Sequence, residues 1–136
     1  NAVGEKCNAK GIRFGYHNHD KEFSTDLEGK PVYDWMLELT DPAKVMFQLD
    51  LYWIVEGGKD PVNYFNDHAG RFELWHIKDK EEVGASGEMD FEAMFALKEK
   101  SGFQYGIVEV EEYNFEPIVS CQKSLEWLNA TDYIDL

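Results

Sequence analysis

The sequence predicts an α/β fold in which parallel strands alternate with covering helices. Four short segments are rich in aromatic and β-branched residues, and each is followed by a segment with the apolar spacing of an amphipathic helix. The strand-plus-helix unit repeats after about 30 residues, the size typical of βαβ connections. Strands that alternate with helices along a chain favour a parallel sheet with helices packed on it.

The four predicted strands cover residues 12–16, 45–50, 72–77 and 106–110. A helix end is expected within the first ten residues, stopping at Gly11. Prolines stand where three of the other helices would begin, at Pro31, Pro61 and Pro117, and the missing N–H of proline costs nothing at a first helical position. The apolar positions that predict these helices are Val32, Trp35, Met36 and Leu39; Val62, Phe65 and Ala69; Phe91, Met94 and Phe95 after Asp90 as an N-cap; and Ile118, Cys121, Leu125 and Leu128.

Right-handed crossovers leave two architectures for such a sheet, an open doubly wound sheet or a barrel. A nucleotide-binding open sheet would carry a GxGxxG or GxxxxGK[ST] loop after a strand, and the sequence has neither. A complete (βα)8 barrel needs roughly 250 residues, so four units in 136 residues make about half of one. An isolated half would expose two edge strands and the apolar inner face of the sheet. We therefore expect that the other half is elsewhere or that two copies associate.

The composition excludes several classes of function. Hydrophobic residues make up 43% and aromatic residues 15%, which is enough to build a core. The 13 basic and 27 acidic residues give a net charge of -14, which opposes binding to nucleic acid or to anionic lipid. No apolar run approaches the roughly 18 residues that a membrane span needs. The charge is compatible with a cation-binding site or a neutral small substrate.

The cysteines and the N-terminus are less informative. Cys7 and Cys121 lie far apart, so neither a thiolate zinc site nor a disulfide scaffold is indicated, and we expect two ordinary thiols on helices. The chain begins with Asn1 and shows no targeting segment, so we expect that an N-terminal region has been removed. The compartment stays undetermined, with the cytoplasm as the default.

Ionisable residues stand at the carboxyl end of every predicted strand. Alternate residues of a strand share a face, and in each predicted strand the last residue on one face is ionisable. These residues are His17, Asp50, His76 and Glu109. Sites in parallel βα folds form at that end of the sheet, so four adjacent strands would bring these side chains to one rim. Two imidazoles and two carboxylates suit a divalent cation such as Zn, Mn or Co better than Mg.

Each of these residues taken singly also has a structural explanation. A histidine at a strand end is commonly a core or rim residue, and Asp50 is in a position to cap the following turn. Glu109 is harder to explain, since an inward carboxylate after Gly-Ile-Val is costly unless it is paired or bound to metal. The coincidence over four consecutive strands favours a shared polar site. Glu112 is expected to be solvated at the start of a loop.

Two further rim residues have open roles. Lys78, two residues beyond His76 on the same face, is either a polarising cation or the partner of Asp79 or Glu109 in an ion pair. Trp53 follows Asp50 and either packs in the core or lies against the face of a sugar ring.

Four motifs in order resemble those of the sugar phosphate isomerase/epimerase family, with its xylose isomerase-like TIM barrel. They are residues 15–23 (GYHNHDKEF), 49–53 (LDLYW), 76–79 (HIKD) and 107–109 (IVE). The resemblance runs over nearly the whole chain but covers only the second half of such a barrel. It implies that residues 1–136 are the C-terminal half of a (βα)8 TIM barrel, with four parallel βα units that correspond to strands five to eight.

The resemblance also implies a function. It assigns a divalent metal to His17, Asp50, His76 and Glu109, and a sugar or sugar phosphate as the small-molecule partner. It implies ketose–aldose isomerisation or epimerisation through an enediolate, with carboxylates moving the proton. The sequence departs from better-known sugar epimerases, because His17 or His19 stands where a Glu is typical and Trp53 replaces a second His. These departures leave room for dehydratase or lyase chemistry on keto sugars or inososes.

We expect Glu109 or His19 to act as the base and Lys78 to neutralise developing negative charge. Asp20 or Glu22 would hold His17 by a hydrogen bond. The competing hypothesis is a half-barrel fragment without turnover that binds metal or dimerises. A homodimer, or an N-terminal half supplied from elsewhere, would complete the barrel.

Overall fold

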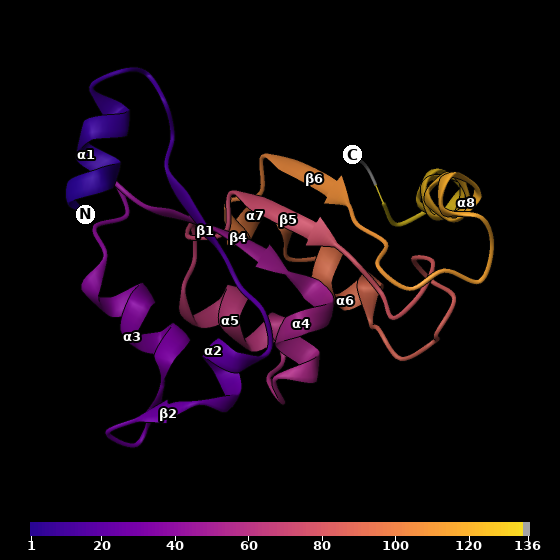
Figure 1. Ribbon diagram of the computed structural model, residues 1–136, viewed down its shortest axis with the longest axis horizontal. Coiled ribbons are helices and arrows are strands. Elements are labelled where there is room, and N and C mark those ends of the chain that lie inside the picture. Colours follow the sequence, from indigo (N-terminus) through magenta and orange to yellow (C-terminus); the bar gives the residue numbers. More distant parts are fainter. Residues whose placement is uncertain (135–136) are drawn as a thin grey trace.

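A computed structural model of the chain describes residues 1–134 and contains a four-stranded parallel sheet (Figure 1). The strand order is β1-β4-β5-β6, and every neighbouring pair is parallel. The strands are β1 (Gly15–His17), β4 (Met46–Asp50), β5 (Leu74–Ile77) and β6 (Tyr105–Val108). The predicted α/β fold with four parallel strands is therefore confirmed, and it is consistent with half of a TIM barrel.

The helices of the described residues are α1 (Ala2–Asn8), α2 (Lys21–Ser24), α3 (Val32–Leu39), α4 (Leu51–Glu56), α5 (Pro61–Asp67), α6 (Phe91–Phe95), α7 (Lys98–Ser101) and α8 (Pro117–Ala130). Pro61 and Pro117 begin α5 and α8, and the Asp90 side chain caps α6, as the sequence predicts. Three short helices, α2, α4 and α7, were not predicted, because four to six residues are too few to show an apolar period. None of the helices in residues 1–134 is long and apolar enough to cross a bilayer.

The prediction that Pro31 begins a helix is wrong. Pro31 ends a small antiparallel hairpin of β2 (Asp26–Leu27) and β3 (Lys30–Pro31), where it pairs with Asp26. Its backbone is extended, with φ -52° and ψ 141°, and α3 begins one residue later. Proline fixes φ alone, so the same residue suits a strand end as well as a helix start.

The two faces of the sheet are covered differently. On the face toward α3–α6, Phe47, Leu49, Trp75 and Ile77 are buried, and the Phe65 ring stacks on Trp75 with centroids 4.7 Å apart. On the opposite face, Tyr105 and Ile107 of β6 are 71% and 44% exposed. An uncovered inner face is what half of a barrel would show.

The predicted apolar stripe of α8 faces the core only at Leu128, and Ile118, Cys121 and Leu125 are exposed. Ile118 is 78% exposed, Cys121 is also exposed, and the residues that α8 buries are Ser120, Ser124 and Leu128. The cause is a polar contact: the Ser120 hydroxyl donates to the Glu82 carboxylate, and the Ser124 hydroxyl accepts from the Val83 N–H. In α3 the buried residues are likewise Tyr33 and Leu37, whereas the predicted Leu39 is exposed. Cys7 and Cys121 are free thiols on helices, as predicted.

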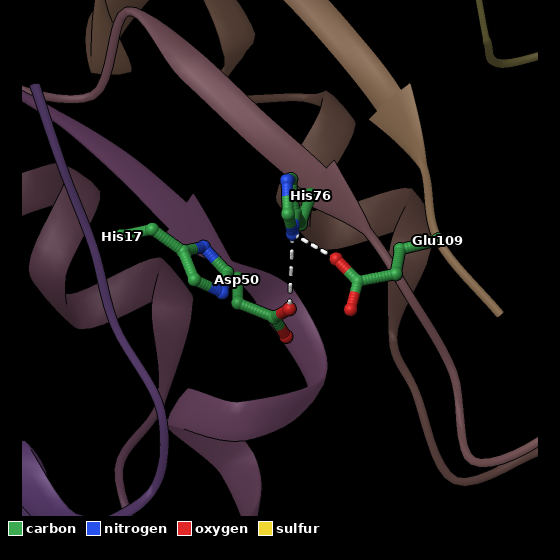
Figure 2. Close-up of side chains that lie close together, drawn as sticks. All are labelled: His17, Asp50, His76 and Glu109. Carbon is green, nitrogen blue, oxygen red and sulfur yellow. Dashed lines mark ion pairs between the residues drawn. The ribbon is translucent and has the colours of Figure 1, made fainter. Parts of the chain in front are cut away.

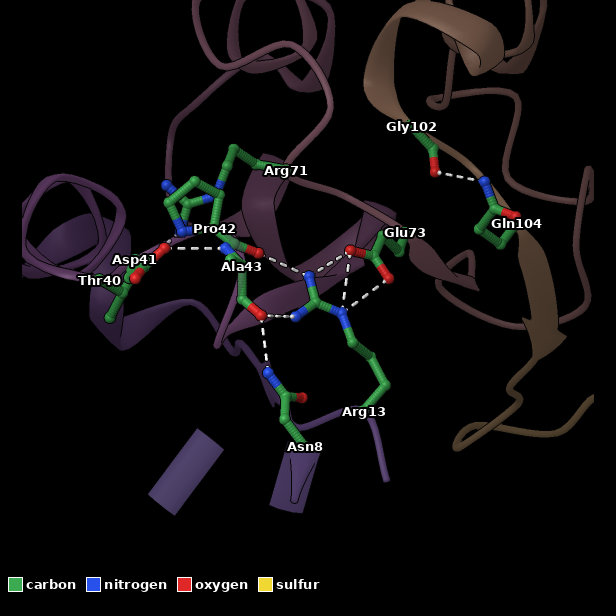
Figure 3. A network of polar contacts seen from close by, with 10 residues as sticks. All are labelled: Asn8, Arg13, Thr40, Asp41, Pro42, Ala43, Arg71, Glu73, Gly102 and Gln104. Atoms are coloured by element: carbon green, nitrogen blue, oxygen red, sulfur yellow. Dashed lines mark hydrogen bonds and ion pairs between the residues drawn. The ribbon is translucent and has the colours of Figure 1, made fainter. Parts of the chain in front are cut away.

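A polar network holds the amino ends of the strands together (Figure 3). The Arg13 guanidinium donates to both carboxylate oxygens of Glu73 and to the carbonyl oxygens of Pro42 and Ala43. Asn8 of α1 donates to the same Ala43 oxygen, at 2.8 Å. The network connects the segments that lead into β1, β4 and β5, and so it fixes the spacing of the strands that carry the rim residues.

Candidate metal centre

The four predicted ligands meet at the carboxyl end of the sheet (Figure 2). His17 is the last residue of β1, Asp50 ends β4, His76 lies in β5, and Glu109 follows β6. Register explains the convergence, because Asp50 pairs directly with His76 and Glu109 follows the strand that pairs with β5. One ligand atom from each of the four side chains lies within 4.8 Å of every other.

Asp50 uses its two carboxylate oxygens for different purposes. Oδ1 accepts hydrogen bonds from the N–H groups of Tyr52 (3.0 Å) and Trp53 (2.8 Å), which caps α4. Oδ2 is buried, has no hydrogen-bond partner and lies 3.5 Å from His76 Nδ1. The capping alternative is therefore confirmed for one oxygen, and the other is left free to face the cluster.

The two imidazoles lie close together, with ring centroids 4.2 Å apart. Burial lowers the pKa of His17 below its usual value, and the neighbouring His76 ring lowers it further. Its Nδ1 atom is buried without a hydrogen-bond partner. A neutral imidazole with a free nitrogen is the form in which histidine coordinates metal.

Glu109 completes the cluster on the side of β6. Its Oε2 atom contacts His76 Nδ1, and its side chain is 24% exposed. Burial raises the pKa of the Glu109 carboxyl, and the adjacent His76 ring opposes that rise. A second carboxylate, Asp50, raises it further, which shows that the site concentrates negative charge.

These residues fit a divalent metal. Buried polar atoms are normally satisfied by hydrogen bonds, and here Asp50 Oδ2 and His17 Nδ1 are not. Two nitrogen and two oxygen donors form a ligand set that suits Zn, Mn or Co. Among the described residues, this is the one group of three or more such side chains whose geometry allows a metal.

Lys78 lies beside the cluster with a partner that the sequence did not indicate. Its ammonium contacts the Glu111 carboxylate at 2.7 Å, although the side chain of Lys78 is only 1% exposed. The predicted pairing with Asp79 is wrong, because Asp79 instead accepts from the N–H groups of Lys80 and Gly84 and organises the following loop. Glu109 interacts with Lys78 through charge, but the close contact belongs to Glu111.

His19 and Trp53 lie at the outer edge of the cluster. The exposed His19 ring lies 5.0 Å from the His17 ring and 5.8 Å from the Trp53 ring. The buried Nε1 atom of Trp53 has no hydrogen-bond partner. We predicted that Asp20 or Glu22 would hold His17 by a hydrogen bond, and neither does. Glu22 accepts hydrogen bonds from the Tyr16 hydroxyl and the His19 N–H. Asp20 forms an ion pair with Lys21.

Sequence reasoning missed two residues that shape the site. Asn18 is fully buried, and its Oδ1 atom accepts from the Asp50 N–H at 3.0 Å, which ties β1 to the end of β4. Glu111 was given no role at the site, although it lies two positions beyond Glu109 on the same alternating set. That alternation was the available signal for Glu111. Asn18 was overlooked because it lies between two histidines that were the candidate ligands.

Comparison with solved structures shows close likeness to half of a larger protein. A crystal structure of a sugar phosphate isomerase/epimerase from Parabacteroides distasonis superposes on the chain with a TM-score of 0.91 and 35% sequence identity. The superposition covers 98% of this chain and 50% of that one. A second such structure from the same organism gives a TM-score of 0.90 and 34% identity. The four sequence motifs predicted a resemblance to sugar phosphate isomerase/epimerase proteins, and these two structures confirm that resemblance.

Curated relatives give the same picture at lower identity. An inosose dehydratase from Lacticaseibacillus casei is 24% identical over 95% of this chain and 51% of its own length. One from Geobacillus thermodenitrificans is 26% identical over 82% of this chain and 45% of its own. No protein-family profile matches the chain. The chain thus spans about half the length of the curated relatives it matches.

Proposed function

We propose, from the resemblance of this chain to half of a sugar phosphate isomerase/epimerase, that it carries the metal centre of an enzyme that moves protons on a keto sugar. The observation that carries the proposal is the convergence of His17, Asp50, His76 and Glu109, with ligand atoms within 4.8 Å of one another. The chain would form the C-terminal half of a (βα)8 barrel, with strands five to eight. Such barrels place their active sites at this end of the strands.

The metal's ligands would be one nitrogen from each of the two histidines and one oxygen from each of the two carboxylates. A divalent ion bound there would act as a Lewis acid on the oxygens of a sugar and so acidify the neighbouring C–H bond. The chain's own contribution is rigidity: the cap of α4 and the Asn18 hydrogen bond hold Asp50 in place before any ion binds.

Proton transfer would fall to Glu109 or His19. Burial raises the pKa of Glu109, and a carboxylate with a raised pKa is a better base near neutral pH. His19 lies on the solvent side of His17, where an imidazole can exchange protons with water. The buried ammonium of Lys78 would stabilise the negative charge of an enediolate.

The relatives' names favour a second reaction of the same kind. An inosose dehydratase removes a proton beside a carbonyl and then loses water, so the first step is shared with an isomerase or epimerase. The chain has His17 in place of a typical glutamate, so a second carboxylate for a two-base epimerisation is absent at that position. Product identity separates the two reactions, since only the dehydratase changes the composition of its substrate.

The proposed site is tested with paired aspartate variants. Both Asp50 and Asp60 cap a helix, but Asp60 caps α5 and is outside the ligand group. Asp50→Ala should abolish bound metal, measured by plasma emission spectrometry, and exchange of a keto sugar's α-proton in D2O. Asp60→Ala should lose about 1 kcal/mol of stability from its cap and retain both properties.

Retained stoichiometric metal in Asp50→Ala would refute the metal centre. Metal binding without any proton exchange or dehydration would favour the competing hypothesis of a half barrel that binds metal without turnover. Size measurement in solution shows whether two copies associate to complete the barrel.

A further inference from the structure

The proposed ligand Glu109 stands on a segment that has no regular structure of its own. Figure 2 shows Glu109 beyond the end of β6, and residues 109–116 form neither helix nor strand. The Glu109 N–H donates to the Ile77 carbonyl at 3.3 Å, and Val110 is buried, but residues 111–116 are exposed. A segment with few buried apolar contacts has low local stability. Its polar contacts therefore decide how firmly Glu109 is held.

The buried carboxylate of Glu82 grips this segment from the neighbouring loop. Glu82 is only 5% exposed. Its Oε1 atom accepts from the Asn114 N–H at 3.0 Å, and its Oε2 atom accepts from the Asn114 side-chain amide at 2.8 Å. Oε1 also accepts from the Ser120 hydroxyl on α8. Glu82 thus fixes both the backbone and the side chain of a residue five positions beyond Glu109.

Glu82 can act as an anchor because its own loop is organised from within. Asp79, two residues after β5, is 1% exposed and accepts from the backbone N–H groups of Lys80 and Gly84. Buried carboxylates whose oxygens all have donors make a loop rigid. The loop continues directly from β5, the strand that carries His76. The Glu82 carboxylate therefore links the segment after β6 to the strand that bears another ligand.

We propose that Glu82 is a positioning residue of the metal centre, which holds Glu109 beside His76 by gripping Asn114. Glu82 is outside the ligand group, so it acts on the metal only through the segment that it holds. With the segment fixed, the fourth ligand is in place before an ion binds, and less conformational entropy is lost on binding. This inference rests on the proposed function, since it concerns the same metal centre.

The test uses Co2+, because the visible absorption of this ion reports the number and geometry of its ligands. Glu82→Ala removes all three hydrogen bonds and should lower Co2+ affinity about tenfold. Asn114→Ala removes the side-chain bond alone and should lower it at least about threefold. Both spectra should shift toward that of Glu109→Ala. Competition with a chromophoric chelator gives the affinities, and Asn114→Ala, at an exposed residue, decides the test if Glu82→Ala does not fold.

Ser124→Ala is the matched control, because it detaches the same loop from α8 and leaves Asn114 held. The Ser124 hydroxyl accepts from the Val83 N–H at 3.0 Å. Its loss should lower the urea midpoint, since a buried N–H loses its partner, but leave Co2+ affinity and spectrum as in wild type. An equal fall in affinity in Ser124→Ala would show a general loosening and overturn the positioning role. So would wild-type affinity and spectrum in Asn114→Ala.

A double variant shows whether the effect passes through Glu109. In a Glu109→Ala background, Asn114→Ala should change Co2+ affinity by less than about 1.5-fold, because the ligand that it positions is already gone. A fall as large as in the wild-type background would overturn the proposal, since Asn114 would then act by another route.

Co2+ binding by the wild-type protein separates this inference from the proposed function. If the wild type binds no Co2+, the metal centre and the positioning role are refuted together. Normal Co2+ binding together with any overturning result above would refute the positioning role and leave the metal centre intact.

Discussion

The two ends of the parallel sheet carry different charged clusters, Arg13 with Glu73 at the amino end and the four proposed ligands at the carboxyl end. These clusters differ in whether their polar atoms have hydrogen-bond partners. At the amino end, every side-chain nitrogen of Arg13 donates to Glu73 or to a backbone carbonyl (Figure 3). At the carboxyl end, Asp50 Oδ2 and His17 Nδ1 are buried without hydrogen-bond partners (Figure 2). Both clusters join residues far apart in the sequence through the same strands.

The difference separates a structural cluster from a site. A satisfied network contributes to stability and has no capacity left for a ligand. An unsatisfied buried cluster lowers the free energy of unfolding, and a ligand that binds the native state raises it again. Variants at the amino end should therefore change unfolding, and variants at the carboxyl end should change metal affinity.

The largest effect should come from removing a ligand. His76→Ala deletes a nitrogen at the centre of the cluster, and we expect metal affinity to fall at least about 100-fold. Competition with a chromophoric chelator measures the affinity. Glu73→Gln serves as the amino-end control and should leave it unchanged; an equal loss in both variants would erase the distinction between the two ends.

A smaller effect is expected from the residue that positions Asp50. Asn18→Ala removes the acceptor of the Asp50 N–H and should lower metal affinity about tenfold. It should also lower the free energy of unfolding by about 1–3 kcal/mol, because a buried N–H loses its partner. Chelator competition and urea unfolding give the two values, and unchanged metal affinity would mean that Asn18 has no part in positioning the site.

At the amino end, a double-mutant cycle of Arg13→Ala and Glu73→Ala should give a coupling energy of about 1 kcal/mol or less. The pair is partly exposed, so solvent screens it, although its two-pronged geometry places it toward the upper part of that range. Urea unfolding of the four proteins supplies the energies. We expect no change in metal affinity in any of them, and a change would link the two ends.

A last prediction concerns stability against pH, at a carboxylate of the carboxyl end whose partners are already present. The hydrogen bond from Ser120, with further ones from Asn114, lowers the pKa of Glu82 to about 2. Because the folded pKa lies below the ordinary value of 4.5, the stability that Glu82 contributes is present above that value and is lost as pH falls toward 2.

Wild-type protein should consequently lose stability more steeply than Glu82→Gln between about pH 4.5 and 2. The urea midpoint at a series of pH values measures the two slopes. Parallel slopes would show that Glu82 is not held as a satisfied carboxylate.

The sequence predicts much of the fold and the four converging side chains, because strand ends and alternation are local features. Which oxygen of Asp50 caps α4, and which faces His76, depends on the backbone beyond β4. Alternation places Glu111 on the face of Glu109, but whether it pairs with Lys78 depends on the path of the chain after Glu109. The buried faces of α3 and α8 were predicted only in part: Leu128 and Met36 contact the core, whereas Tyr33 and Ser120 are placed by tertiary contacts and not by apolar spacing.

The most direct test of the metal centre is anomalous diffraction from crystals grown with Zn2+ or Mn2+, recorded at the absorption edge of the ion. We predict one strong peak at about 2.0–2.2 Å from an atom of each of His17, Asp50, His76 and Glu109. A peak elsewhere, or an ordered cluster with no peak at a saturating concentration of either ion, would contradict the metal centre.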